Sequence, residues 1–369
     1  MLNIGRQFGK TMLAMNQLYF WMFNDAGCKC AWVSPVYKQS KKVFEEMVQA
    51  FAGTDLIQTN ATELTIKCGK SSLQFFSAER YDNIRGFTFD YLVCDEFAFM
   101  DEEAWTEVLR ATVLVKGKKV LLISTPKGKN HFYNLYNLDG VNPQYKSFTM
   151  SSYNNPLINP SEIDDARLTL PDHVFRQEYL AEFIDGGAGI FSPKFETATG
   201  GTRFYAGVDL GRADDYSVIS IFNEQGKQVY LERWRHDSWS NISAKIAARI
   251  NEFNAITYVE VNSIGDAIME QIKNQCRTPM NVNPFVTTSK SKNDIIESLA
   301  VATQQNAVTF LPVDWLIKEF DVFTFEYNAK SRSIKYGAPY GFHDDGIMAT
   351  AIAYESLKHP IYSAVSVHF

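Results

Sequence analysis

The sequence has no long apolar run. A membrane-spanning helix needs roughly 18 consecutive apolar residues, and no such stretch occurs. Near the N-terminus, the apolar stretch from Met12 to Phe23 is interrupted by Asn16 and Gln17. Asp25 stands where a lipoprotein signal needs an aliphatic residue. We therefore expect neither a membrane contact nor secretion.

Cysteine is scarce and its spacing is irregular. Only Cys28 and Cys30 lie close together in the sequence, and no second pair completes a zinc-binding set. The full set is odd in number: Cys28, Cys30, Cys68, Cys94 and Cys276. Such a set is typical of reduced thiols, so the expected location is the cytoplasm of a cell.

Basic residues are not in excess. The chain has 36 Lys and Arg against 42 Asp and Glu, a formal net charge of −6, which excludes histone-like DNA binding but not binding through local patches. Hydrophobic residues make up 46% of the chain, which excludes a disordered or collagen-like protein. At about 150 residues per domain, the 369 residues suggest two or three domains.

Residues 1 to about 180 alternate helical and strand patterns, with a hairpin predicted around Gly69. Helices are predicted at Thr11–Phe23, Lys41–Phe51 and Glu102–Thr112. Strands are predicted at Lys29–Ser34, Leu64–Cys68, Ser72–Phe76, Tyr91–Cys94 and Lys119–Ser124. Continuous apolar strands between helices indicate a largely parallel sheet that is covered on both faces.

The segment from Asp185 to Gly201 is rich in glycine and lacks periodic apolar positions, so it is predicted to be a linker. We therefore expect a first domain at 1–184, a linker at 185–203 and a second α/β domain at 204–369. In the second domain, strands are predicted at Phe204–Asp209, Tyr216–Phe222, Gln228–Trp234 and Thr257–Val261. Helices are predicted at Ser240–Phe253, Ile264–Asn274, Asn293–Gln304 and Asp344–Leu357.

A phosphate-binding loop is predicted at Gly5–Thr11, GRQFGKT, because it opens directly into a helix. A phosphate needs backbone N–H groups at a helix N-terminus, a lysine for the β and γ oxygens and a hydroxyl for Mg²⁺, which Gly9, Lys10 and Thr11 supply. Ile4 stands where the usual pattern has its first glycine, so this is a variant loop. A chance GKT before a helix is the alternative.

The stretch Tyr91–Glu96, YLVCDE, is a buried strand that ends in two acids, the Walker B pattern. Asp95 is predicted to hold Mg²⁺ and Glu96 to polarise the attacking water. The alternative is a strand that ends in two solvated acids. The predicted nucleotide-binding residues are thus Gly5, Arg6, Gln7, Gly9, Lys10, Thr11 and Asp95.

Two further features fit the hydrolysis of a triphosphate. The strand Lys119–Ser124 is followed by Thr125, and a hydroxyl there would sense the γ-phosphate. A positive group is needed to neutralise charge in the transition state. Arg6, inside the loop, and Arg85, before the Walker B strand, are both candidates for this arginine finger, and an ordinary solvated arginine is the alternative for each.

Acids also stand in the apolar strands of the second domain. Asp209 ends one strand, and Glu260 lies in another, where an acid is costly unless it is paired or bound to a cation. Asp344 and Asp345 open the last helix, where Asp344 would also make a good N-cap. Asp209, Glu260 and Asp345, with Asp344, are predicted to hold two divalent cations for phosphodiester hydrolysis.

Other polar residues near these acids are assigned lesser roles. Asp214 and Asp215 are expected in a turn or behind the metal ligands. His343 is expected to be a polar cap, and a proton carrier is the alternative. The order of elements, with three strands, a helix, a strand and a late helix that bears the last acid, is that of a ribonuclease H-like nuclease.

Together these motifs resemble the large terminase subunit of tailed bacteriophages, and the T-even-like branch in particular. The resemblance covers nearly the whole chain in the right order. It rests on Gly5–Thr11, Val93–Glu96, Ile123–Phe132, Gly211–Tyr216, Val259–Gly265 and His343–Asp345. The fold that it implies is a P-loop ATPase sheet of the ASCE type followed by a ribonuclease H-like domain.

The resemblance also implies roles for residues. Lys10 and Thr11 would bind ATP with Mg²⁺, Glu96 would be the catalytic carboxylate, and Arg6 falls where the family has its loop arginine. Ser124 and Thr125 match the motif that couples hydrolysis to motion. Asp209, Glu260 and Asp345 match the nuclease ligands for two Mg²⁺ or Mn²⁺ ions.

The partners implied are double-stranded DNA, the portal protein of the procapsid, a small terminase subunit and further copies of the chain in a ring, in the host cytoplasm. Members of the family carry a substantial segment before the phosphate loop, whereas only Met1–Ile4 precede it here. The alternatives are therefore a nuclease alone, or a non-catalytic packaging component, whose short first domain does not turn over ATP. A recombinase or junction resolvase would not explain the Walker motifs.

Overall fold

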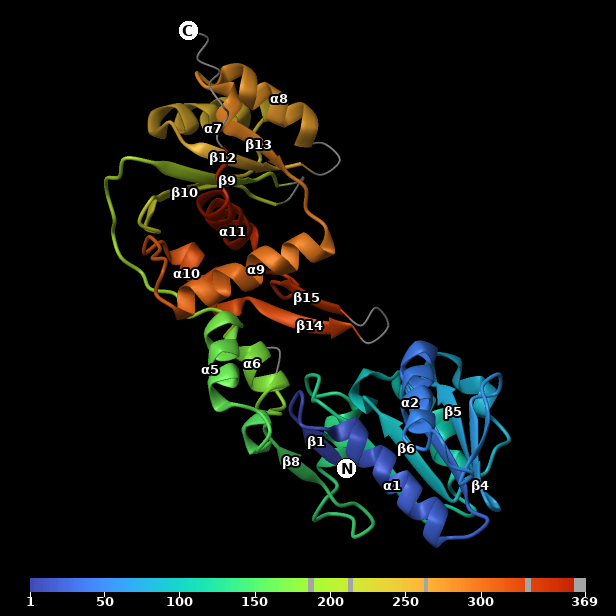
Figure 1. The fold of residues 1–369 in the computed structure, drawn as a ribbon. Helices are drawn as coiled ribbons and strands as arrows, with labels where there is room; N and C mark the ends of the chain where they lie inside the picture. Colours follow the sequence, from blue (N-terminus) through green and yellow to red (C-terminus); the bar gives the residue numbers. More distant parts are fainter. Residues whose placement is uncertain (185–188, 212–214, 262–264, 329–332, 362–369) are drawn as a thin grey trace. The chain divides into compact units, whose positions relative to one another are not determined.

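The structure is a computed structural model and describes residues 1–184, 189–211, 215–261, 265–328 and 333–361. The chain divides into two compact units (Figure 1). The first comprises Met1–Ala166, His173–Asp185 and Tyr327–Ser333, and the second comprises Arg167–Asp172, Gly186–Glu326 and Ile334–Phe369. No helix among the described residues is long and apolar enough to cross a membrane.

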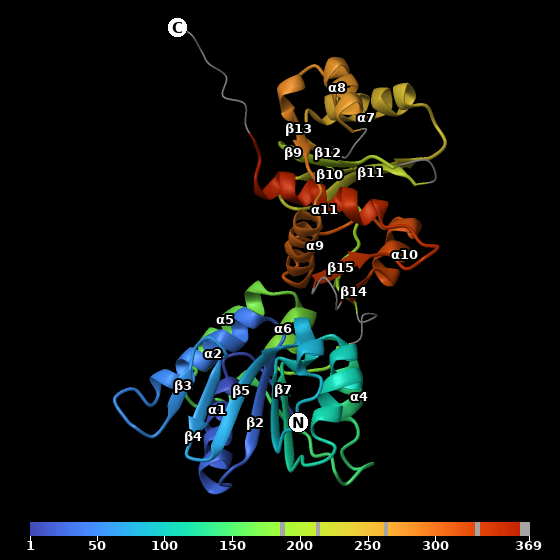
Figure 2. The same ribbon diagram turned by 90° about the vertical axis from the view of Figure 1, so that its right-hand side faces the viewer.

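The first unit is built on an eight-stranded sheet with the order β3-β4-β5-β2-β6-β7-β1-β8, part of which is seen in Figure 2. In this order, the six strands from β5 to β8 are parallel to one another. β4 is antiparallel to both of its neighbours, β3 and β5. Their bounds are Leu2–Ile4 (β1), Lys29–Ser34 (β2), Gln58–Asn60 (β3), Thr65–Cys68 (β4), Ser71–Ser77 (β5), Tyr91–Asp95 (β6), Lys119–Ser124 (β7) and Phe148–Met150 (β8).

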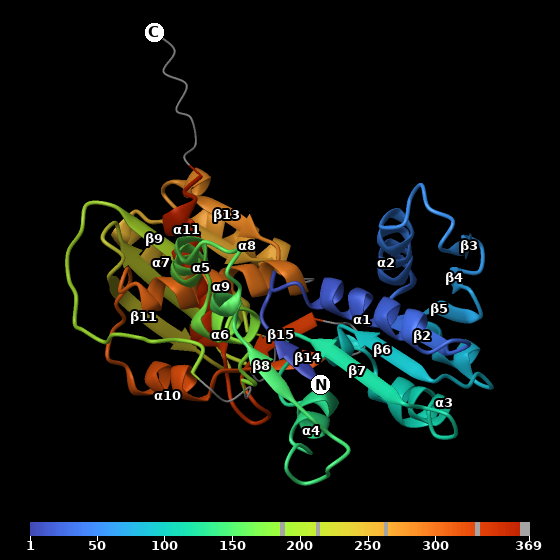
Figure 3. The ribbon, with the colours of Figure 1, turned by 60° about the horizontal axis from the view of Figure 1, so that its bottom comes forward.

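Helices cover both faces of this sheet, as its apolar strands predict. On β2, Trp32 packs into one core with α1 and α2, while Ala31 and Val33 pack into a second core on the opposite face. Helix α1 lies against β6 and β7 (Figure 3). The helices are Lys10–Asn24 (α1), Tyr37–Gln49 (α2), Arg110–Thr112 (α3), His131–Tyr136 (α4), Pro160–Thr169 (α5) and Asp172–Glu178 (α6).

The helix predicted at Glu102–Thr112 differs in form from expectation. Residues Ala104–Leu109 wind as a π-helical turn, which leads directly into α3. Its buried side chains, among them Trp105 and Leu109, pack on the same core as Phe97. A sequence pattern shows which face is apolar but does not separate one winding from the other.

The second unit contains a five-stranded sheet with the order β11-β10-β9-β12-β13. Strand β9 pairs with β12 in parallel and with β10 in antiparallel. The strands are Phe204–Asp209 (β9), Ser217–Asn223 (β10), Gln228–Trp234 (β11), Ile256–Glu260 (β12) and Val282–Phe285 (β13). A separate two-stranded sheet is formed by Thr324–Asn328 (β14) and Ser333–Gly337 (β15).

Helices α7 and α8 cover one face of this sheet and α11 the other (Figure 1). Gly207 on β9 permits the close approach of α11, because a Cβ there would lie 2.1 Å from the backbone nitrogen of Ala353. The helices are Trp239–Phe253 (α7), Gly265–Gln275 (α8), Ser289–Gln304 (α9), Asp314–Val322 (α10) and Asp345–Lys358 (α11).

Candidate functional site

The predicted phosphate loop leaves the end of β1 and enters α1 in the first unit. Gly9 has a φ of 97° and Gln7 a φ of 58°, so both adopt the left-handed conformation that a tight loop needs. Gly5 approaches another segment closely, because a Cβ there would lie 2.5 Å from the carbonyl oxygen of Tyr179. The loop therefore has the glycines where its geometry requires them.

Hydrogen bonds hold this loop against the chain from residue 150 to 178. The N–H of Gly5 donates to Met150 O (2.9 Å) and the N–H of Arg6 to Glu178 O (2.8 Å). Ser152 Oγ donates to Arg6 O at 2.8 Å. Asn155 Nδ2 donates to the carbonyl oxygen of Gln7 at 2.9 Å.

Lys10 is buried at the mouth of the loop. Its Nζ donates to Ile4 O at 3.1 Å and to Gly5 O at 3.3 Å. Burial lowers the pKa of this ammonium, and the carboxylates of Glu96 and Asp95 oppose that shift. The lysine is thus placed among acids and carbonyls, in a position to meet an anion that enters the loop.

Asp95 and Glu96 lie at the end of β6, next to the loop. Burial and the neighbouring Glu96 raise the pKa of Asp95 to about 7. The Oγ1 of Thr11 donates to Asp95 Oδ2 at 3.4 Å, while Asp95 Oδ1 is buried without a hydrogen-bond partner. A hydroxyl beside an unsatisfied carboxylate oxygen fits the hard oxygen donors that Mg²⁺ prefers.

Glu96 is held in position by the next strand of the sheet. It adopts a left-handed backbone conformation with a φ of 51°, and burial raises the pKa of its carboxyl. Ser124, at the end of β7, donates from Oγ to Glu96 Oε2 at 3.3 Å. Because β7 lies between β1 and β6, the Ser124–Thr125 pair comes between the phosphate loop and the acids.

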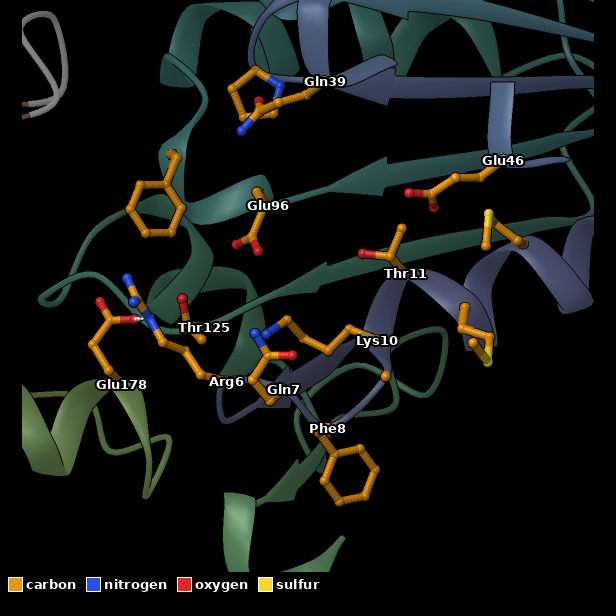
Figure 4. Close-up of a pocket in the computed structure, with 15 residues that line it drawn as sticks. Arg6, Gln7, Phe8, Lys10, Thr11, Gln39, Glu46, Glu96, Thr125 and Glu178 are labelled. Atoms are coloured by element: carbon orange, nitrogen blue, oxygen red, sulfur yellow. Dashed lines mark hydrogen bonds and ion pairs between the residues drawn. The ribbon is translucent and has the colours of Figure 1, made fainter. Parts of the chain in front are cut away.

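A pocket of about 580 Å³ opens beside the loop (Figure 4), and the predicted residues Gly5 and Asp95 lie outside its wall. Of the predicted nucleotide-site residues, the structure brings together in its wall Arg6, Gln7, Gly9, Lys10, Thr11, Glu96 and Thr125. The prediction missed other lining residues, which include Gln39, Glu46, Phe99 and Glu178. Phe99 follows the Walker B strand in the turn Phe97–Phe99, whereas no motif marks Gln39, Glu46 or Glu178, which the fold brings to the loop on α2 and α6.

The two candidate arginines differ in their surroundings. Arg6 lines the pocket, and its Nε donates to Glu178 Oε2 at 2.8 Å (Figure 4). Arg85 does not line this pocket: it is exposed and pairs with Asp82 at 2.7 Å and Glu107 at 3.1 Å. Of these two candidates, the structure therefore places Arg6, and not Arg85, at the phosphate loop of its own chain.

In the second unit, Asp209 and Glu260 end two adjacent parallel strands. Val208 pairs with Val259, so the two acids that follow stand side by side at the same edge of the sheet. Burial raises the pKa of Asp209 well above its usual value, and a hydrogen bond with the Glu260 carboxyl raises it further. Two neighbouring carboxylates repel each other when both are charged, and a bound cation would offset that repulsion.

Asp345 completes the group from the first turn of α11. Its Oδ2 accepts the N–H of Tyr216 at 3.0 Å, and burial raises the pKa of its carboxyl to about 6. Asp215, His343 and Asp345 each offer a ligand atom within 4.8 Å of the others. Asp344 is instead paired with Lys292, whose Nζ lies 3.0 Å from Asp344 Oδ2.

This donor set is rich in carboxylate oxygen, which suits Mg²⁺ or Mn²⁺. The sequence analysis placed Asp215 and His343 in lesser roles, whereas the structure groups both with Asp345. Their predicted neighbour Asp214 lies outside the described residues.

Comparison with known proteins assigns the family. Residues 1–197 match the family described as terminase large subunit, T4-like virus type, N-terminal. The chain belongs to the T4-like family of phage large terminase subunits. The resemblance expected from the motifs is thereby confirmed.

Relatives of this large terminase subunit extend over nearly all of its length. The large terminase subunit of Thermus virus P23-45 is 28% identical over 96% of this chain and 84% of its own. That of Escherichia phage T5 is 24% identical over 80% of this chain and 71% of its own. One solved structure of a large terminase from a thermophilic bacteriophage has a TM-score of 0.54 at 11% identity, covering 96% and 93% of the two chains, a likeness of fold.

Proposed function

We propose that this large terminase subunit is an ATP-driven DNA-packaging motor joined to a metal-dependent endonuclease that cuts concatemeric viral DNA. One observation supports both activities: a single chain holds a phosphate loop that faces buried acids and a second set of buried acids at the ends of adjacent strands. We assign the first activity to residues 1–184, the second to 204–369, and a linking role to 185–203.

In the first domain, the backbone N–H groups of Gln7–Gly9 and the ammonium of Lys10 would bind the phosphates of ATP, since the N–H groups of Gly5 and Arg6 already hold the loop in place. Thr11 and Asp95 would hold Mg²⁺, which neutralises phosphate charge when bound. Glu96, fixed by Ser124, would orient the attacking water and accept its proton, with Thr125 beside it. Arg6 would stabilise the charge that develops on the transferred phosphate.

In the second domain, Asp209, Glu260 and Asp345 would hold two divalent cations, with Asp344 the fourth candidate. Such ions, Mg²⁺ or Mn²⁺, supply a Lewis acid and lower the pKa of a bound water. Tyr216 would keep the Asp345 carboxylate aimed at the site through its N–H bond.

Arg85 is exposed and does not line the pocket of its own chain. It would therefore act only on the pocket of a neighbouring copy of the chain. That geometry agrees with the expected ring of subunits on the portal protein of a procapsid. The other proposed partners are double-stranded DNA and a small terminase subunit, and the proposed location is the host cytoplasm.

Plasmid cleavage tests the nuclease. We expect Asp209→Asn to abolish cleavage that depends on Mg²⁺ or Mn²⁺ while the far-ultraviolet circular dichroism stays unchanged. Asp294→Asn, an exposed acid on α9, is the matched control and should cleave like the wild type. Full cleavage by Asp209→Asn would remove this acid from the site.

Nucleotide binding tests the motor. We expect a fluorescent ATP analogue to bind the wild type and Lys67→Ala, an exposed control on β4, but not Lys10→Ala. DNA-stimulated release of phosphate should be lost in Glu96→Gln. If the wild-type chain cleaves DNA but binds no nucleotide, the motor function is refuted and the chain acts as a nuclease only.

A further inference from the structure

Helix α11, which carries Asp345, begins without a cap of its own. Asp344 stands at the N-cap position, but its side chain makes no capping hydrogen bond and pairs with Lys292 instead. The N–H groups of its second and third residues, Gly346 and Ile347, donate to Glu319 Oε2 at 2.9 Å and 3.2 Å. A glutamate from α10 thus caps the helix on which a proposed metal ligand stands.

Glu319 is enclosed at this position. Its side chain is 7% exposed. A Cβ on Gly346 would lie 2.7 Å from Glu319 Oε2 and 2.5 Å from Cζ3 of Trp315, so a larger residue would displace these two side chains. The close approach of α10 to the first turn of α11 is therefore built into the sequence of both helices.

Arg233, on β11, connects Glu319 to the other side of Asp345. Its Nη1 lies 3.9 Å from Glu319 Oε1. The guanidinium packs on two rings, 4.2 Å from the centroid of Tyr216 and 4.3 Å from that of Trp315. Cation–π contacts of this kind orient an arginine as well as attract it.

Tyr216 closes the network on the carboxylate itself, because its backbone N–H donates to Asp345 Oδ2 at 3.0 Å. The main chain after Asp345 is held by Glu319, and the side chain is held by Tyr216. Arg233 contacts both of these residues. The position of Asp345 is thus fixed from two directions by one connected group.

We propose that Glu319, together with Arg233, is the positioning residue that sets Asp345 in place as a metal ligand. The proposal rests on the proposed nuclease function. Outer partners that orient a metal ligand typically change metal affinity by about 10–100-fold when they are removed. Neither Glu319 nor Arg233 needs to touch a cation or DNA for this effect.

Binding of Mn²⁺ alone to the full chain, measured by calorimetry, tests the proposal. We expect Glu319→Leu, which removes both acceptor oxygens, to weaken Mn²⁺ binding by about 10–100-fold. Glu319→Gln keeps a carbonyl oxygen for the two N–H groups and should restore binding to within about threefold of wild type. Glu270→Leu and Glu270→Gln, at an exposed position on α8, are the matched controls and should bind like the wild type.

Plasmid cleavage against Mn²⁺ concentration gives a second readout, in which Glu319→Leu should need more metal than Glu319→Gln. If Glu319→Leu does not fold, Arg233→Gln replaces it and should weaken Mn²⁺ binding in the same direction. Unchanged Mn²⁺ binding in the folded variant overturns the positioning role. A wild type that neither binds Mn²⁺ nor cleaves overturns the nuclease function itself, whereas an Asp345→Asn variant unchanged in both overturns the role of Asp345 as a metal ligand and with it the positioning role of Glu319.

Discussion

Replacing Gly207 by alanine should separate α11 from β9, and the structure sets the size of the effect. The added Cβ would lie 2.1 Å from Ala353 N and 2.3 Å from Ala349 O, whereas real Cβ atoms essentially never come within 3.0 Å of such atoms. Both are backbone atoms of a helix, so no side chain can turn aside. The helix has to move by about 1 Å, and overpacking of a core costs typically 1–3 kcal/mol.

Because the clash is with backbone, we take the upper end, about 3 kcal/mol. For a unit of this size, 1 kcal/mol lowers the melting temperature by about 2–4 °C, so calorimetry should show a fall of about 6–12 °C. Cleavage should fall by about 100-fold, because a 1 Å displacement separates the acid on α11 from that on β9. Binding of an ATP analogue by the first unit should not change.

Gly189→Ala provides the control for this substitution. The nearest atom to its added Cβ is 3.6 Å away, an ordinary contact, so its melting temperature should stay within about 1 °C of wild type. The prediction is wrong if Gly207→Ala has the same melting temperature as Gly189→Ala and cleaves DNA at the wild-type rate. The close packing of α11 on β9 would then not determine the position of the acids.

Three further variants test the first domain. Burial holds the pKa of Asp95 near 7, above its value in the unfolded chain, so this group makes the metal-free protein less stable as the pH rises from about 4 to about 7. When the free energy of unfolding is measured against pH in EDTA, Asp95→Asn should remove on the order of 4 kcal/mol of this pH-dependent loss. An unchanged dependence on pH would contradict the raised pKa. Glu178→Gln removes the charge that holds Arg6 in position, so kcat for ATP hydrolysis should fall several-fold. The free energy of unfolding should fall by less than about 1 kcal/mol, because the Arg6 side chain is largely exposed. Arg85→Ala should bind ATP normally yet hydrolyse it slowly in the assembled ring, and weakened binding would place Arg85 in its own pocket.

Much of both sheets could be predicted, because buried parallel strands read as continuous apolar runs. Lys29–Ser34 and Lys119–Ser124 have the same bounds in the structure as in the prediction. β8 was missed, because its three residues are exposed and it forms a strand only by pairing with β1. β13 contains Pro284, which argues against a strand, but the edge of the sheet tolerates a residue without an N–H.

The same difference holds for the sites. The place of Lys10 and Thr11 in the pocket wall could be predicted, because the loop and the start of the helix are adjacent in the chain. Glu178 and Glu319 could not, because each contacts its site from a helix that is distant in sequence and carries no motif. Whether the predicted ligands act as assigned stays a prediction that the variants above address.

The hydrogen bonds that hold the phosphate loop from residue 150 to 178 bear on how fast a nucleotide can associate. Since Gly5, Arg6 and Gln7 are anchored through their backbone before any phosphate arrives, little conformational freedom is lost on association. Association should then be limited by diffusion into the pocket, and differences among nucleotides should appear in their residence times.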